Sequence, residues 1–238
     1  MERLDKFLCD SGAGTRSQVK AILKSGRVTV DGKPEKDPSK KVDIGTQTVC
    51  LDGEPLTGKR RMVVMLNKPA GFVTATEDAS ERTVMELLPE QWRHLDLKPV
   101  GRLDKATEGL LLFTNDGELM QRLIHPKYEV DKLYRVTVRG DWEKGVPLLR
   151  QMRVLEGEPI APAQVELMRA EDGCAVLHIT IHEGKNRQIR RMCRQAGLTV
   201  LRLERLAEHG ILLGNLPCGK CRALTDKEVK TLKGCEEK

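Results

Sequence analysis

A glycine-bounded polar turn is the part of this chain best suited to chemistry. Residues 101–110 read Gly-Arg-Leu-Asp-Lys-Ala-Thr-Glu-Gly-Leu and run directly into Leu111-Leu112-Phe113, which is typical of a buried strand. Loops held by a rigid scaffold commonly carry function, and such a turn can fix a side chain at the edge of a cleft. Taken alone, an aspartate in a turn more often caps that turn. Asp104 is nevertheless the first candidate for a catalytic carboxylate.

A second candidate lies in a helix that the periodicity predicts for residues 187–196. Projected at 100° per residue, one face is apolar, formed by Ile189, Met192, Cys193 and Ala196. Arg190 falls nearest to that face, so its guanidinium is expected to point inward. An unpaired charge there would cost roughly 3–5 kcal/mol, so the guanidinium needs an anionic or hydrogen-bonded partner. Asp104 is the candidate partner.

Three other segments extend the pattern in chain order. They are Asn67–Gly71 (NKPAG), Lys132–Tyr134 (KLY) and Glu183–Met192 (EGKNRQIRRM). Together with the turn at Asp104, they resemble the motifs of the RsuA/RluB/RluE/RluF family of RNA pseudouridine synthases. The resemblance covers almost all of residues 62–205, and four co-ordered motifs are far more specific than one.

The resemblance implies a reaction and a catalytic set. Family members break the N1–C1′ bond of a uridine, turn the base over and rejoin it through C5, without a cofactor. The implied catalytic residues are Asp104, Tyr134 and Arg190. A carboxylate near C1′ would act as nucleophile or stabilise positive charge on the ribose, and a neighbouring arginine would keep it ionised. The family tyrosine stacks on the base and is implicated in removing the C5 proton.

The same resemblance implies contacts with RNA. A stacked uridine cannot present C1′ and C5 to a pocket, so the nucleotide must be extruded. Arg102 would fill the vacated place or hold a phosphate, and Leu203 would pack against the target base. Lys68 and Arg187, in the first and third motifs, are also assigned to substrate binding.

The first quarter of the chain predicts a separate RNA-binding module. Helical periodicity over residues 3–11 and again after residues 11–14 is followed by a strand, the hairpin turn Asp31-Gly32 and further short strands. This pattern resembles the S4-like RNA-binding domain. The second helix carries a basic stripe whose members are four residues apart, Arg16, Lys20 and Lys24.

The rest of the chain predicts an α+β domain. Residues 1–57 form the S4-like domain, the charged stretch 58–61 a linker, and residues 62–238 a catalytic domain. Short strands mixed with short helices, without a βαβ rhythm, indicate a mixed, mostly antiparallel sheet. Strands are expected near residues 62–66, 110–114, 132–139 and 175–181, with helices after the turn at 115–117 and at 187–196.

Charge and cysteine content limit the class of protein. The net charge is +6. Residues 1–61 contain 13 Lys/Arg against 9 Asp/Glu, and residues 182–205 contain 7 against 2, so the excess is local, as in a polyanion-binding protein. The absence of a long apolar run predicts a cytoplasmic protein without a membrane partner. The seven scattered cysteines favour reduced thiols.

Three questions stay open at this point. The Cys218–Cys221 pair has metal-ligand spacing but no second pair to complete a zinc site, so we expect no metal. A non-catalytic ribosome-associated RNA-binding factor is the alternative to an enzyme. Residues 131–134 and the short C-terminal end are more similar to the family member acting on small-subunit (16S) ribosomal RNA, whereas residues 183–192 are also close to the large-subunit (23S) branch. The prediction is a monomer that acts on ribosomal RNA or a pre-ribosomal particle, with 16S favoured.

Overall fold

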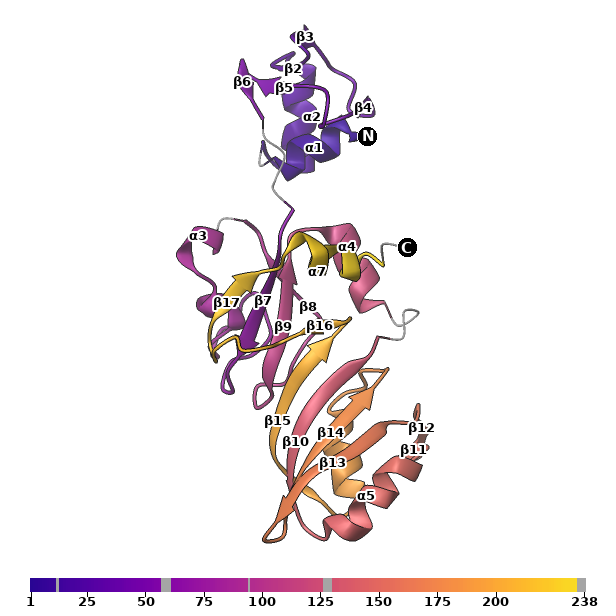
Figure 1. Ribbon diagram of the computed structural model, residues 1–238. Coiled ribbons are helices and arrows are strands. Elements are labelled where there is room, and N and C mark those ends of the chain that lie inside the picture. The colour runs from indigo at the N-terminus through magenta and orange to yellow at the C-terminus, as the bar shows by residue number, and fades with distance from the viewer. Residues whose placement is uncertain (12, 57–60, 94, 126–129, 235–238) are drawn as a thin grey trace. The chain divides into compact units, whose positions relative to one another are not determined.

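The computed structural model describes residues 1–238 apart from 12, 57–60, 94, 126–129 and 235–238. The chain divides into two compact units, Met1–Arg61 and Met62–Lys238 (Figure 1). The linker expected at 58–61 lies outside the described residues except for Arg61. No helix in the described part of the chain is long and apolar enough to cross a membrane.

The first unit packs two helices on small sheets. Helices α1 (Leu4–Asp10) and α2 (Arg16–Lys24) face a sheet of order β3-β2-β5-β6, and β1 (Glu2–Arg3) pairs with β4 (Lys41–Val42). The sheet strands are β2 (Val28–Val30), β3 (Lys33–Pro34), β5 (Val49–Leu51) and β6 (Glu54–Pro55). A capping box between Thr15 and Gln18 fixes the start of α2. Val19 and Leu23, four residues apart on one face of this helix, are buried in the core of the first unit. The predicted αα-β arrangement is confirmed.

The second unit is built on one nine-stranded sheet. Its path is β13-β14-β10-β15-β9-β7-β17, with β8 added to β9 and β16 to β15. The strands are β7 (Val63–Lys68), β8 (Lys98–Val100), β9 (Glu108–Thr114), β10 (Lys132–Arg139), β13 (Gln164–Glu171), β14 (Cys174–Ile181), β15 (Thr199–Glu208), β16 (Ile211–Leu212) and β17 (Cys221–Ala223). Among the strands that the structure describes in this sheet, β15 and β9 are the one parallel pair, and the other pairs are antiparallel. The predicted mixed, mostly antiparallel sheet is confirmed.

The two halves of this sheet are covered differently. Strands β7 and β9 are buried on both faces, with Val64 and Leu111 in one core cluster and Val63 and Leu110 in another, so they read as continuous apolar runs. Helices α4 (Gly117–Ile124) and α7 (Asp226–Leu232) contribute to the second cluster. η1 (Val84–Leu87) packs on the first cluster, close to the short helix α3 (Glu90–Arg93).

Strands β10 and β14 instead alternate buried and accessible residues. Helices α5 (Trp142–Gln151) and α6 (Gln188–Gln195) pack on one face of this half, next to the hairpin of β11 (Val154–Leu155) and β12 (Glu158–Pro159) (Figure 1). Because only one face is covered, hydrophobic residues occupy every second position.

A short parallel seam joins the halves. It contains two residue pairs, Glu204 with Glu108 and Arg205 with Gly109. Gly109 has φ +99°, and a Cβ there would lie 2.3 Å from the Arg205 carbonyl oxygen, so only glycine allows this approach. The seam places the turn that precedes β9 next to β15, and through β15 next to β10.

Candidate active site

Main-chain hydrogen bonds fix the turn that carries Asp104. The Thr107 amide donates to the Asp104 carbonyl at 2.9 Å, and the Gly71 amide donates to the Lys105 carbonyl at 2.8 Å. The Thr74 hydroxyl donates to the carbonyl of buried Leu103 at 2.7 Å. Asp104 itself is half-buried, and among the described residues its carboxylate has no hydrogen-bond or ion-pair partner. A carboxylate is therefore held rigidly by its backbone and left available to a ligand.

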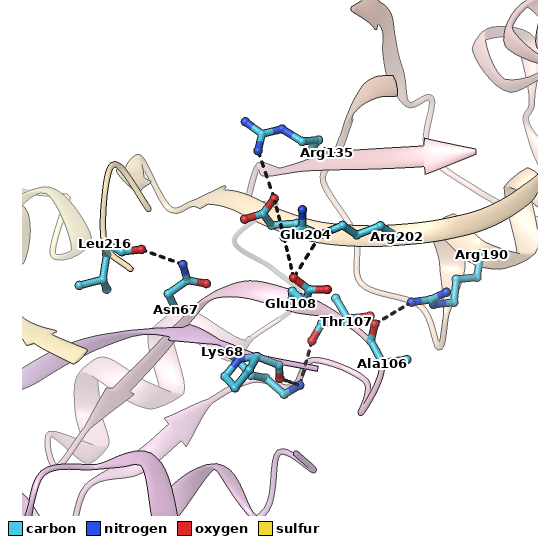
Figure 2. Close-up of polar contacts among 11 residues, drawn as sticks. Asn67, Lys68, Ala106, Thr107, Glu108, Arg135, Arg190, Arg202, Glu204 and Leu216 are labelled. Carbon is cyan, nitrogen blue, oxygen red and sulfur yellow. Dashed lines mark hydrogen bonds and ion pairs between the residues drawn. The ribbon is translucent and has the colours of Figure 1, made fainter. Parts of the chain in front are cut away.

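Lys68 supports this turn from inside the protein. Its side chain is fully buried, and its Nζ donates to the carbonyl of Thr107 at 2.8 Å (Figure 2). The same Nζ donates to the carbonyls of Pro69 at 3.0 Å and of Asp104 and Lys105 at 3.3 Å each. One ammonium thus connects the end of β7 to three carbonyls of the turn, those of Asp104, Lys105 and Thr107. Sequence reasoning assigned Lys68 to substrate binding, but the ammonium is turned toward the backbone rather than the solvent.

Burial and charge act on Lys68 in opposite directions. Burial lowers the pKa of its ammonium to about 8, while the negative charges of Glu108 and Asp104 raise that pKa. At neutral pH the group is therefore still mainly protonated, as its carbonyl contacts require. A positive charge lies directly behind the Asp104 turn.

Arg190, on α6, reaches the same turn from the other half of the sheet. Its Nη2 donates to the Ala106 carbonyl at 3.1 Å (Figure 2). Burial lowers the pKa of Arg190, and the charge of Asp104 raises it. The inward direction was predicted correctly, but the predicted direct ion pair with Asp104 was wrong: within the described residues the guanidinium bonds to the backbone two residues further on. The carbonyl satisfies the half-buried guanidinium, and the carboxylate acts on it through space.

Arg187 marks the sharp start of α6. It adopts φ +48°, a left-handed conformation uncommon for a residue with a side chain, and it is exposed. Behind it, Gln188 is buried and donates to Glu183 at 2.7 Å, while Lys185 Nζ donates to the Pro159 carbonyl at 2.6 Å. The loop is thus braced from within while Arg187 faces outward.

Tyr134 and Leu203 lie on the face of the sheet that α6 covers. Both are buried, and Leu203 pairs with Val136 while Tyr134 pairs with Arg205 across β10 and β15. Burial is the main cause of a raised pKa of the Tyr134 hydroxyl, and the negative charge of Asp104 adds to it. Tyr134 therefore lies close enough to the turn for the charge of Asp104 to act on its hydroxyl group.

A buried ion pair next to Tyr134 was missed by sequence reasoning. Arg205 and Glu208 have side chains only 3% and 6% exposed, with Nη2 and Oε2 3.0 Å apart. Arg205 Nε also donates to the Leu110 carbonyl at 2.8 Å. Residues three apart in a regular strand face opposite sides. The register shift opposite Leu133/Tyr134 adds one residue to β15, and that bulge turns both side chains to the same face.

A surface ion-pair network lies over the seam. Arg202 contacts Glu108 at 2.8 Å, and Arg135 contacts Glu204 at 3.2 Å (Figure 2). These residues belong to β9, β10 and β15, so the network spans the junction between the halves.

The other predicted residues are less enclosed. Arg102 is exposed beside the turn, and Arg16, Lys20 and Lys24 are exposed on α2 of the first unit. Cys218 is exposed, whereas the Cys221 thiol donates to the Leu87 carbonyl at 3.5 Å. No three His, Cys, Asp or Glu side chains gather as metal ligands in the described ranges.

Comparison with known proteins agrees with this geometry. The family model described as RNA pseudouridylate synthase matches residues 61–195, and the S4 domain model matches residues 2–47. An uncharacterised RNA pseudouridine synthase of Bacillus subtilis (strain 168) is 40% identical over 97% of this chain and 98% of its own length.

A second relative from the same organism, ribosomal large subunit pseudouridine synthase B, is 36% identical over 98% of this chain and 96% of its own length. A solved structure described as a pseudouridylate synthase superposes with a TM-score of 0.65 at 30% identity, covering 98% of this chain and all of that one. The chain therefore belongs to the RsuA/RluB/RluE/RluF family of RNA pseudouridine synthases, isomerases that convert uridine to pseudouridine in RNA.

Proposed function

We propose that this enzyme isomerises a uridine of ribosomal RNA, with Asp104 as its catalytic carboxylate. The observation that carries the proposal is the half-buried Asp104 carboxylate. Among the described residues this carboxylate has no hydrogen-bond or ion-pair partner, and it interacts electrostatically with Lys68 and Arg190. Lys68 and Arg190 thus place positive charge next to the Asp104 carboxylate. Such a group can attack C1′ or stabilise the positive charge that develops there when the N1–C1′ bond breaks.

Tyr134 and Leu203 would receive the everted base. They line the same buried face next to the turn, and a tyrosine ring gives a flat stacking surface with a polar end. In this proposal Tyr134 takes part in removing the C5 proton, and Arg190 orients the turn through the Ala106 carbonyl. Lys68 acts as a positioning residue, because the hydrogen-bond partners of its ammonium among the described residues are all backbone carbonyls.

Exposed cations would hold the RNA around the turn that carries Asp104. Arg102 and Arg187 flank the turn and the start of α6, and both side chains are free to reach phosphates or the place that the base leaves. In the first unit, residues 1–57 would bind RNA through an exposed stripe on α2, which consists of Arg16, Lys20 and Lys24.

Substitution of Asp104 tests the catalytic assignment. Asp104→Asn keeps the size of the side chain and removes its charge, so we expect RNA binding to persist while tritium release from C5-labelled uridine in transcribed ribosomal RNA stops. Lys105→Met is the matched control, because Lys105 lies on the same turn but pairs with Glu81 at the surface. Full turnover by Asp104→Asn would exclude the proposed role.

The choice of ribosomal subunit belongs to the same proposal. The relative named for the large subunit matches nearly the whole chain, which favours 23S ribosomal RNA as the substrate. The sequence of residues 131–134 favours 16S ribosomal RNA as the second candidate. Mapping pseudouridines in both RNAs from cells with and without the gene decides between them: one position should lose its modification, and loss in neither RNA would reject a ribosomal substrate.

A further inference from the structure

The buried pair formed by Arg205 and Glu208 has no role in the function proposed so far. Its members are almost completely enclosed, and such pairs are often no more stabilising than apolar residues of similar volume. Arg205 Nη1 donates to Glu208 Oε1 at 3.0 Å and its Nε donates to the Leu110 carbonyl. Nη2 lies 3.0 Å from Glu208 Oε2, yet it is buried and makes no hydrogen bond of normal geometry with any residue that the structure describes. A buried donor in this state calls for an explanation.

The backbone directs this donor toward Tyr134. Arg205 is the cross-strand partner of Tyr134, so the two side chains stand on the same face of neighbouring strands. The bulge in β15 brings Glu208 to that face as well, opposite Lys132. Bulges next to active sites commonly re-aim a side chain. Here the bulge builds a row that runs from Glu208 through Arg205 to Tyr134.

The seam also fixes Arg205 relative to the catalytic turn. Arg205 pairs with Gly109, five residues after Asp104, and its main-chain atoms approach Gly109 more closely than any side chain would allow. The Arg205 guanidinium bonds to the carbonyl of the next residue, Leu110. Arg205 is thus held by β9 on one side and faces Tyr134 on β10 on the other.

We propose that Arg205 is a positioning residue, clamped by Glu208, whose Nη2–H donates to the Tyr134 hydroxyl oxygen, fixes the ring against the target base and stabilises its anionic form. This inference rests on the proposed role of Tyr134 in removing the C5 proton. We expect this hydrogen bond to tighten when the base enters, as catalytic hydrogen bonds often do.

The proton balance of the step is simple. After the N1–C1′ bond has broken and C1′ has bonded to C5, the Tyr134 phenolate oxygen takes the C5 proton and becomes a phenol, while the electron pair of the C5–H bond returns to the uracil ring. N1, released from C1′, takes a proton from water, and Tyr134 later returns its proton to water. Reactant and product are isomers, so no oxidant, reductant or cofactor is needed.

Because Arg205 and Glu208 carry opposite charges, they should shift the pKa of the Tyr134 hydroxyl in opposite directions. The positive charge and hydrogen bonding of Arg205 lower the pKa of the Tyr134 hydroxyl, whereas Glu208 raises it. Asp104 raises it further, while Lys132 and His209 are the other titratable groups around the pair. Arg205→Met should therefore raise the Tyr134 pKa, and Glu208→Gln should lower it. A purely structural role for the pair gives no reason for shifts of opposite sign.

The tyrosine content of the chain makes this measurable. Tyr128 and Tyr134 are the only two tyrosines in the sequence, so a Tyr128→Phe background leaves Tyr134 as the single phenol. Its ionisation can be followed by the near-ultraviolet absorbance of phenolate, without RNA. Arg135→Met is the matched control, because Arg135 is the next residue on β10 but lies on the opposite face, paired with Glu204. The control should leave the phenolate titration unchanged.

Single-turnover rates complete the test. Losing a charge-assisted hydrogen bond to a reacting group should slow Arg205→Met about 10-fold to 100-fold, with RNA affinity preserved. Combined with Tyr134→Phe, the same change should have little additional effect, because both act on one group. If Arg205→Met does not fold, Arg205→Met combined with Glu208→Gln removes the pair without leaving a lone buried charge, and the carbon-13 shift of labelled Tyr134 then reports the lost contact at neutral pH.

An unchanged Tyr134 titration in Arg205→Met, or shifts of the same sign in both single variants, would overturn the inference. So would full additivity with Tyr134→Phe. These outcomes are distinct from a failure of the proposed function, since the phenolate titration requires no substrate: absence of pseudouridine in ribosomal RNA with intact opposite shifts rejects the substrate, not the positioning.

Discussion

Replacing Lys68 with methionine tests how the interior of the protein controls the catalytic turn. Methionine fills a similar space but cannot donate to the four carbonyls that surround Lys68 Nζ. Two of these carbonyls keep another donor, since Asp104 accepts from Thr107 and Lys105 from Gly71. Within the described structure, Pro69 and Thr107 lose the donor that Lys68 provides.

The opposing energies are of similar size. Each unsatisfied buried carbonyl costs about 1–3 kcal/mol. The fall of the Lys68 pKa from 10.5 to about 8 means that keeping this charge inside costs about 3 kcal/mol, a penalty that methionine removes. The net change in unfolding free energy is therefore small, at most a loss of about 3 kcal/mol. The turn, however, loses its internal anchor, and a displacement of about 1 Å at a reacting group can reduce the rate about 100-fold.

The assay compares tritium release in a single turnover, RNA affinity and thermal unfolding for Lys68→Met. We expect a rate at least about 10-fold lower with affinity unchanged, while Lys105→Met stays close to the unaltered protein. A rate close to that of the unaltered enzyme would refute this account of Lys68, and so would a parallel loss of RNA affinity, which would mean that Lys68 contacts RNA directly.

The pH dependence supplies a second readout for Lys68. Above pH 8 the folded protein releases the Lys68 proton, the ammonium weakens as a donor, and the rate should fall. Between pH 8 and 10.5 the unfolded chain still binds that proton, so the contribution of Lys68 to the unfolding free energy rises with pH. Between pH 8 and 10.5 the rate should therefore fall while the unfolding free energy rises, and both changes should be absent in Lys68→Met. Identical pH profiles for the two proteins would contradict the assignment.

Three further predictions concern other parts of the structure. Gly109→Ala should destabilise the enzyme by about 3 kcal/mol or more in denaturant titrations, because its Cβ would overlap the Arg205 backbone, whereas Gly101→Ala, with open space around its Cβ, should cost about 1 kcal/mol; equal losses would argue against a tight seam. Burial lowers the His209 pKa to about 4, so its contribution to stability is present above pH 6.5 and is lost as the pH falls toward 4; His209→Gln should flatten that part of the profile, and an unaltered slope would count against it. Neutralising Arg16, Lys20 and Lys24 together should reduce the slope of log affinity against log salt by about 2 to 3, and an unchanged slope would show that the stripe is only solvated.

The spacing of hydrophobic residues predicted two kinds of element correctly: those with one exposed face, and strands that are buried on both faces. The strand at 132–139 and the helix around 188–195 were predicted almost to the residue, because alternation and the 3.6-residue period are unambiguous there. Helix α5 escaped prediction. It contains Gly145 and Pro147, and a Cβ at position 145 would lie 2.7 Å from a methyl carbon of the Leu198 side chain, which would then have to move. Tertiary packing overrides helix propensity at that point.

The site could be predicted by residue type but not by contact. Asp104, Tyr134 and Arg190 lie around one turn, so the motifs predicted which residues come together, and their roles in catalysis stay predictions. The bond from Arg190 to a carbonyl, the inward turn of Lys68 and the Arg205–Glu208 pair depend on backbone details that the sequence does not display. A bulge moves every later side chain of the strand to the other face of the sheet. No residue type in β15 predicts that a bulge occurs there.

Assembly of the enzyme follows from the short junction between Glu108–Gly109 and Glu204–Arg205. Each half of the sheet is made from antiparallel neighbours, whereas this junction unites segments almost a hundred positions apart and contains two residue pairs. Such long-range closure carries a high entropic cost and is expected late in folding. The enzyme would then become active in the last step of folding and lose activity in the first step of unfolding. A partial opening that leaves both halves of the sheet intact would already separate Asp104 from Tyr134. If Asp104 and Tyr134 act together as proposed, we expect activity to be lost under mild destabilisation before the helix and strand signals of circular dichroism change.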